Sequence, residues 1–241
     1  MGEDGVRNKP VEEGKSGGRI TPLKVLVTSD FHGSITAFHK AASKAEEEQV
    51  DLIIVCGDIT HFGTVRAARS LLSLLMEPRL PVFFVPGNCD PPSLPSIGVE
   101  GARCIHLTHE HMGDYTFAGI GGGTISPFDT PFEMTEEELR ELLERNLSEL
   151  TVDERLVLVS HMPPANTSVD VTYSGRHIGS SSIREFIERM KPIIVFCGHV
   201  HEAPGIDRID GTMVVNPGPA KDGRCAIANL NEDCEVILDH L

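Results

Sequence analysis

Tryptophan is absent from this chain of 241 residues, which also contains no CxxC pair and no long apolar run. The missing apolar run excludes a transmembrane helix, which needs about 20 consecutive apolar residues. Six cysteines without a paired spacing, together with no secretory signal peptide, argue against a disulfide framework. We therefore expect a soluble protein of the reducing cytoplasm, with no membrane as a partner.

Positive charge is also scarce. The chain has 21 Lys and Arg against 36 Asp and Glu, which gives a formal net charge of −15. A surface of this sign repels polyanions, so no long nucleic acid is expected as a partner. An anionic substrate would need a local attraction, and bound cations would supply it.

The chain divides into an irregular start and a patterned remainder. Residues 1–22 are rich in glycine and charge and lack apolar periodicity, which predicts a flexible N-terminal leader. Residues 23–241 contain no internal repeat and no low-complexity linker. We expect this remainder to form one domain.

Apolar strands alternate with amphipathic helices in the first half of that domain. The predicted strands are Lys24–Ser29, Leu52–Cys56 and Pro81–Val85, and the helices between them are Ile35–Glu48 and Val65–Met76. Continuous apolar strands separated by helices favour parallel pairing, with the helices covering the faces of the sheet.

The second half has more strands than helices. Cys104–Leu107 and Tyr115–Ile120 are predicted strands around a polar turn, and a capping box at Thr135 opens a helix that ends near Leu150. The last strands follow one another too closely for helices to lie between them, which favours antiparallel pairing. The remaining predicted elements are strands Arg155–Ser160 and Pro192–Cys197, helix Ile183–Lys191, and strands Gly205–Ile209, Met213–Asn216, Cys225–Leu230 and Val236–Leu238.

Five of these strands are followed at once by Asp, Asn or His, in the patterns D-x-H, GD, GN, SH and GHxH. In an α/β sheet, ligands bind beyond the carboxyl ends of the strands, so these side chains should converge. The D-x-H and GHxH pairs are spaced i, i+2 and point the same way in extended chain. The seven side chains are Asp30, His32, Asp58, Asn88, His161, His199 and His201.

Carboxylate, amide and imidazole ligands suit manganese, iron, zinc, nickel or cobalt. Seven ligands exceed the three or four of one catalytic metal, and with one bridging carboxylate they fit two. Two such metals can clamp a phosphate, polarise it and supply a hydroxide near neutral pH. A single histidine or Gly-Asp pair would ordinarily be structural, but five such strand ends in one chain favour a metal site.

The ordered set of motifs resembles the calcineurin-like metallophosphoesterase superfamily over about residues 23–218. The resemblance implies an α/β fold, a four-layer α/β/β/α sandwich with two mixed sheets, and a binuclear site at one edge. It implies a hydroxide that bridges two divalent metals, manganese first among them, and attacks a phosphorus atom. The implied first-metal ligands are Asp30, His32 and His201, the second-metal ligands are Asn88, His161 and His199, and Asp58 bridges; Asp58, Asn88 and His161 would act in catalysis.

The chain departs from the wider family at Gly87-Asn88-Cys89-Asp90, where many members have GNHD. A thiol is a poor substitute for the imidazolium that assists the leaving group. GNCD resembles the small phosphodiesterase branch, which implies a metal-dependent hydrolase of a small phosphodiester, or of an activated phosphomonoester. Asp90 is expected to orient a metal-binding histidine, with a turn-capping role as the alternative.

Three further residues are candidates for substrate binding beside Asn88. His61 lies three residues after Asp58 and could replace the missing acid, although an exposed histidine before a helix is the plain alternative. Arg176 and His177 lie in a Ser/Gly-rich loop between two ligand motifs and could contact the phosphate, or be a solvated pair.

Other features have weaker links to function. The triple-glycine segment 119–123 could frame the pocket, the histidines of segment 106–111 are assigned to a turn, and Asn216-Pro-Gly218 is interpreted as a structural turn. The apolar stripe of segment 135–150 is typical of a core-facing helix, and a homo-oligomer contact is its alternative.

A non-catalytic binding module is the competing function. The retromer scaffold subunit resembles the same fold and has an impaired metal site. All seven ligand positions of this chain carry competent ligands, and this favours the enzyme.

Overall fold

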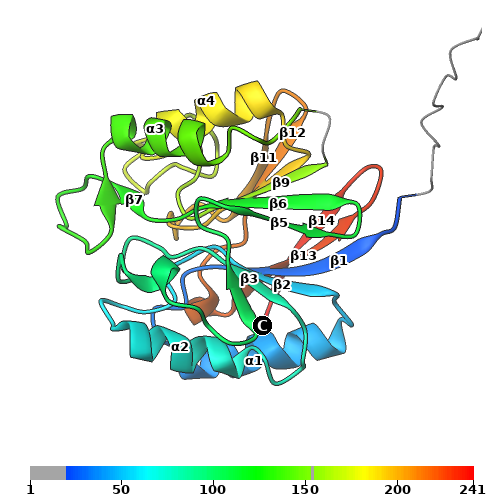
Figure 1. The fold of residues 1–241 in the computed structure, drawn as a ribbon. Coiled ribbons are helices and arrows are strands. Elements are labelled where there is room, and N and C mark those ends of the chain that lie inside the picture. Colours follow the sequence, from blue (N-terminus) through cyan, green and yellow to red (C-terminus); the bar gives the residue numbers. More distant parts are fainter. Residues whose placement is uncertain (1–19, 153–154) are drawn as a thin grey trace, which may run out of the picture.

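The computed structural model describes residues 20–152 and 155–241, and their elements form four layers (Figure 1). Helices α1 (Ile35–Glu47) and α2 (Val65–Leu74) cover one six-stranded sheet, and α3 (Glu136–Asn146) and α4 (Ser181–Met190) cover a second. The two sheets pack against each other between the helix layers. The predicted α/β/β/α sandwich with two mixed sheets is confirmed.

The first sheet has the strand order β14-β13-β1-β2-β3-β4. Strands β1 to β4 pair in parallel, whereas β13 is antiparallel to both β1 and β14. The parallel strands are short and apolar because both of their faces are buried. The strand bounds are β1 Leu23–Thr28, β2 Leu52–Val55, β3 Val82–Phe84, β4 Ala102–Cys104, β13 Arg224–Leu230 and β14 Glu235–His240.

The second sheet has the order β11-β12-β10-β9-β6-β5, with parallel strands in its centre and an antiparallel strand at each edge. A small two-stranded sheet of β7 and β8 lies beyond it. The bounds are β5 His109–Met112, β6 Tyr115–Ile120, β7 Gly123–Thr124, β8 Glu133–Met134, β9 Leu156–Ser160, β10 Ile194–Phe196, β11 Gly205–Ile209 and β12 Thr212–Asn216.

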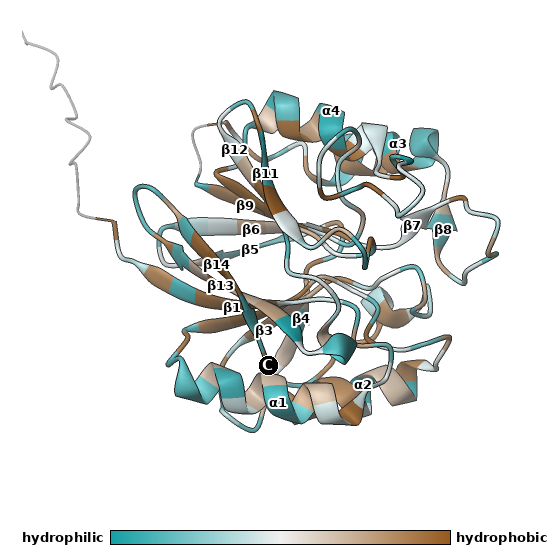
Figure 2. Ribbon diagram, turned by 180° about the vertical axis from the view of Figure 1, so that it is seen from behind, coloured by the Kyte–Doolittle hydropathy of each residue, from teal (hydrophilic) through white to brown (hydrophobic). Residues whose placement is uncertain are grey.

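Alternation along the strands divides the core into three apolar layers. In β1, Val25 and Val27 lie in the layer between the sheets, whereas Leu26 packs with Phe38 of α1 in the layer under the helices. Figure 2 shows strands such as β1 and β9 mainly brown and the helices mixed teal and brown, as expected for helices with one buried face. On α3, Leu139 and Leu143 are buried against the second sheet, and Leu142 is partly buried there.

The helices begin where the sequence predicts, whereas one predicted turn is a strand in the structure. Ser34 and Thr64 cap α1 and α2, and Thr135 and Glu138 form the predicted capping box of α3. The polar turn predicted around residue 110 is wrong, because β5 pairs antiparallel with β6 there. An edge strand tolerates polar residues since one face is open to water, so its sequence lacks the apolar signal of a central strand.

Part of the predicted leader lies outside the described residues. Of its last three residues, Ile20 packs against the core and the Thr21 N–H donates to Asp114. Over the part of the chain that the structure describes, no helix has the length and apolar character needed to cross a bilayer.

Candidate metal centre

The five ligand motifs follow β1, β2, β3, β9 and β10, so they come from both sheets and meet at one edge. The backbone N–H of Asp30 donates to the Gly57 carbonyl over 3.0 Å, and that of His32 donates to the Asp58 carbonyl over 2.8 Å. Within the second sheet, the Gly198 N–H donates to the His161 carbonyl over 3.0 Å and joins the ends of β10 and β9. These bonds hold the strand ends in register around the side chains.

Three of the seven side chains form a first donor group. His32 Nε2 and His201 Nε2 lie 3.1 Å apart, and His201 Nε2 is 3.3 Å from Asp30 Oδ1. Asp58 reaches this group through Oδ2, which is 3.6 Å from His32 Nε2. Oxygen and nitrogen atoms at these spacings can surround one cation.

Three others form a second donor group. His161 Nε2 lies 2.8 Å from Asn88 Oδ1, and His199 Nδ1 lies 3.0 Å from the same oxygen and 3.3 Å from His161 Nε2. Asp58 Oδ1 is 3.6 Å from His161 Nε2. Asp58 therefore directs one oxygen to each group, as a bridging ligand would.

The electrostatics of the site favour a bound cation. Burial raises the pKa of Asp58, and the neighbouring carboxylates Asp30 and Asp90 raise it further. Burial lowers the pKa of His32 to about 4 and that of His199 to about 3, so both imidazoles are neutral at pH 7. Neutral imidazole is the form that binds metals, and a cation would relieve the repulsion between the buried carboxylates.

Four of the seven residues adopt a left-handed backbone. The φ angles are 55° at Asp30, 45° at His32, 50° at Asp58 and 68° at His199. Residues other than glycine rarely adopt this conformation, and where they do it often marks a functional site. The strain is retained because the hydrogen bonds between the motif loops fix the backbone.

The glycines before the ligands serve mainly close packing. Gly57 has a positive φ of 97°, a conformation that glycine adopts without strain. Gly87 and Gly198 are needed for another reason, because a Cβ at Gly87 would lie 2.7 Å from Asp58 Cγ and one at Gly198 would lie 2.7 Å from Asp30 Oδ2. Side chains at these positions would occupy the space of the metal-site carboxylates.

The predicted role of Asp90 is wrong. Its two oxygens accept hydrogen bonds from the backbone N–H groups of Ile59, Thr60 and Gly87 and from the Thr60 hydroxyl, at 2.8 to 3.0 Å. Asp90 therefore ties the loop after β2 to the loop after β3 instead of orienting a histidine. A short polar side chain in a turn has many backbone donors within reach, which is why the alternative role prevails.

Backbone groups orient two of the ligand segments. His161 Nδ1 lies 2.8 Å from the Cys56 carbonyl, which fixes the proton on Nδ1 and leaves the Nε2 lone pair facing Asn88. Asn216 donates to the carbonyls of Val200 and Ala203 and accepts from the Gly218 N–H. The predicted structural turn at residues 216–218 thus also anchors the His199–His201 loop.

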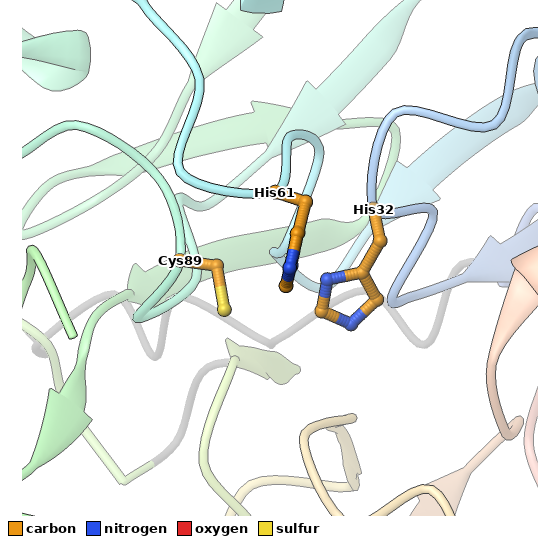
Figure 3. A group of neighbouring side chains, drawn as sticks. All are labelled: His32, His61 and Cys89. Atoms are coloured by element: carbon orange, nitrogen blue, oxygen red, sulfur yellow. The ribbon is translucent and has the colours of Figure 1, made fainter. Parts of the chain in front are cut away.

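His61 and Cys89 lie beside the first donor group. Figure 3 shows their side chains extending into the same space, next to the ring of His32. Ligand atoms of the three residues lie within 4.8 Å of one another, and the ring centroids of His32 and His61 are 5.4 Å apart. His32 Nδ1 is buried and has no hydrogen-bond partner among the described residues. The structure thus brings His61 to the metal edge.

The loop with Arg176 and His177 forms a small hairpin. His177 Nδ1 pairs with the buried Asp170 over 2.7 Å, and the Arg176 side chain is exposed. Neither residue has a described contact with the seven ligands. The residue of this hairpin that reaches the metal edge is Tyr173, which lines a hollow together with His201. No motif in the sequence marks Tyr173.

The other candidates have structural contacts. Gly123 packs against Asn88, where a Cβ would lie 2.8 Å from the Asn88 Cβ, so the triple-glycine segment borders the second donor group. His106 Nδ1 accepts from the Gly121 N–H over 2.8 Å, and burial lowers the pKa of His106 to about 4. His111 pairs with Thr116 across β5 and β6.

Comparison with known proteins connects this geometry to a family. The family model described as calcineurin-like phosphoesterase matches residues 23–203. An uncharacterized protein of Methanocaldococcus jannaschii is 37% identical over 82% of this chain and 88% of its own length. A probable cyclic nucleotide phosphodiesterase of Vesicomyosocius okutanii is 22% identical over 75% of each chain. A dimetal phosphatase from Danio rerio has the same fold, with a TM-score of 0.60, 14% identity and coverage of 90% of this chain and 95% of its own.

Proposed function

This chain belongs to the calcineurin-like phosphoesterase family, and we propose that it hydrolyses a small phosphodiester with two divalent cations. The observation that carries the proposal is the pair of donor groups that share Asp58, one carboxylate oxygen on each side. An activated phosphomonoester is the alternative substrate. Manganese is the metal proposed first, since mixed oxygen and imidazole donors suit it, with iron, nickel, zinc and cobalt as alternatives.

The residues present fit two cations. In each donor group two imidazole nitrogens lie 3.1 or 3.3 Å apart beside carboxylate or amide oxygens, a spacing at which one cation could bind all of them. Asp30, His32 and His201 would hold one cation, and Asn88, His161 and His199 the other, with Asp58 shared. When bound, two such cations supply a nucleophilic hydroxide at neutral pH and neutralise the charge on a phosphate.

The protein's own groups position the ligands and the substrate. The Cys56 carbonyl holds the Nδ1 proton of His161, so that Nε2 stays a lone-pair donor. Asn88 faces the histidines through Oδ1, which leaves its amide N–H₂ to donate to a phosphate oxygen. Burial, with the nearby Asp58, raises the pKa of Cys89, so its thiol is a poor proton donor for a leaving group.

A panel of esters tests the proposed reaction. Bis(4-nitrophenyl) phosphate, 4-nitrophenyl phosphate and cyclic nucleotides are assayed with manganese, nickel, magnesium and zinc added separately. We expect manganese-dependent hydrolysis that is fastest on a diester and is abolished by a chelator. Failure to hydrolyse any ester with any metal, in folded protein that retains two metals, would favour the non-catalytic scaffold.

Manganese affinity is expected to fall as the pH drops from about 8 to about 5.5. Burial alone would lower the pKa of His201, but its hydrogen bond to Asp30 raises it above the usual value of about 6.5, and the pKa of Asp58 is also raised. Both groups take up a proton in this range, and the metal must displace it. His32 and His199 remain neutral there and contribute no proton.

Calorimetric titration with manganese in buffers of different ionisation enthalpy measures the protons released. We expect release to increase toward pH 6 and the hydrolysis rate to rise from acid toward neutral pH. Binding without proton release at pH 6, or a rate optimum below about pH 5 with both metals retained, would contradict this account.

Cys89 and His61 are expected to affect substrates according to their leaving groups. A nitrophenolate departs without protonation, whereas an alkoxide needs a proton donor. Cys89→His should raise kcat on alkyl esters more than on nitrophenyl esters, and His61→Ala should lower kcat on alkyl esters selectively if His61 is the acid. The comparison is made on both kcat and kcat/KM across a leaving-group series. Equal effects on all esters would show that neither residue protonates the leaving group.

A further inference from the structure

A hollow of about 330 Å³ opens beside the first donor group. His201 forms part of its wall, and the other polar residues that line it are Tyr173, Glu202, Asp222 and Arg224. Its volume is at the lower end of the range for small-molecule pockets, about 300 to 1,000 Å³. A group attached to a phosphate held at His201 would extend into this hollow.

Tyr173 is exposed to solvent on a turn that hydrogen bonds hold in place. Its side chain is 92% exposed. The turn is closed by the Thr172 N–H donating to the Arg176 carbonyl over 2.9 Å, and the Tyr173 N–H donates to Glu202 Oε1 over 3.3 Å. Tyrosine is enriched at binding interfaces, because its ring offers an apolar face while its hydroxyl group stays in water. The ring is therefore available to stack on a planar group.

A charged turn beside the hollow is hydrogen-bonded to the metal edge. The Lys221 N–H donates to the Asp30 carbonyl over 3.3 Å, so the turn that carries Lys221, Asp222 and Arg224 is attached to a ligand residue. Lys221 contributes to the electrostatic field at His32 and at His201. Neither Lys221 nor Arg224 has an ion pair among the described residues, in a chain whose net charge is −15.

We propose that this hollow binds the nucleoside group of a nucleotide phosphodiester, a proposal that rests on the proposed function. The Tyr173 ring would stack on the base, and Arg224 would donate to phosphate oxygens. The carboxylates of Glu202 and Asp222 would accept hydrogen bonds from sugar hydroxyls. These two carboxylates argue against a second anionic group in the hollow, because they offset the charges of Arg224 and Lys221.

Binding of products tests the subsite without catalysis. Adenosine 5′-monophosphate and ribose 5-phosphate are titrated calorimetrically into the manganese-loaded protein. The nucleotide should bind about tenfold more tightly, the typical effect of one base stacked on an aromatic ring. Tyr173→Ala should abolish this preference and Tyr173→Phe should keep it. Arg224→Ala should weaken both ligands, while Arg69→Ala, at an exposed arginine of α2, should weaken neither.

Two diesters with the same leaving group separate the subsite from the chemistry. Thymidine 5′-(4-nitrophenyl) phosphate should have a KM about tenfold below that of methyl 4-nitrophenyl phosphate, and Tyr173→Ala should remove this difference in KM. Equal kcat/KM for the two esters, with no preference for the nucleotide in binding, overturns the subsite and leaves the proposed hydrolysis intact. Tyr173-dependent nucleotide binding without turnover of either ester supports the subsite and overturns the proposed hydrolysis.

Discussion

Asp58→Asn is expected to release manganese and to lower kcat/KM by about 10³-fold or more, since a ligand shared by two cations is lost. The substitution keeps the shape of the side chain. One carboxylate oxygen is replaced by an N–H₂ group, which cannot bind a cation, and each of the two Asp58 oxygens faces one donor group. Metal content, measured after gel filtration, should fall from about two ions per chain to one or none.

The control for Asp58→Asn is Asp210→Asn, at an exposed turn between β11 and β12 with a φ of 51°. Asparagine tolerates that backbone, so metal content and rate should stay at the native level. Asn88→Ala should release only one of the two metals, because Asn88 belongs to one donor group. A variant Asp58→Asn that keeps both metals would contradict the bridging assignment.

The sequence predicts the part of the site that depends on strand ends. Apolar strands of the length seen in β1, β2 and β9 give a strong signal in the sequence. Once such a strand is located, the residue that follows it is located as well. Parallel pairing then brings the ends together, because the topology of an α/β sheet leaves few other arrangements. For this reason Asp30 and Asp58 could be proposed as neighbours from the pattern alone, whereas His161 follows a strand of the other sheet and reaches them through the packing of the two sheets.

Other parts of the site depend on contacts that have no local pattern. The bonds of Asp90 to Ile59 and Thr60 join loops 31 and 30 positions apart in the sequence, and such pairing is visible only in three dimensions. The same holds for Tyr173, whose place beside His201 depends on how the hairpin lies over the β10 loop. Packing between distant segments, not local propensity, decides these positions.

Gly87 packs directly against Asp58, one of the candidate metal ligands. It has an ordinary φ, so a side chain is not excluded by the backbone angle. A Cβ there would instead lie 2.7 Å from Asp58 Cγ and would overlap Asp58 Oδ1 and the Asp58 backbone nitrogen. The backbone atom cannot rotate away, and Asp58 Oδ1 is also held by the Cys89 N–H over 2.8 Å. Any relief must move the Asp58 carboxylate or separate β2 from β3.

Gly87→Ala is therefore expected to lower both activity and stability. Overpacking of this kind costs about 1–3 kcal/mol, which corresponds to a decrease in Tm of several degrees, at about 2–4 °C per kcal/mol in a chain of this size. Displacement of Asp58 should reduce kcat/KM by about 10²-fold or more and weaken manganese binding. Gly98→Ala is the matched control, since a Cβ at Gly98 would meet no atom within 4 Å. Thermal unfolding, metal content and diester hydrolysis are compared for the two variants with the native protein. If Gly87→Ala unfolds at the native temperature and retains two metals, the close contact between Gly87 and Asp58 does not constrain the site.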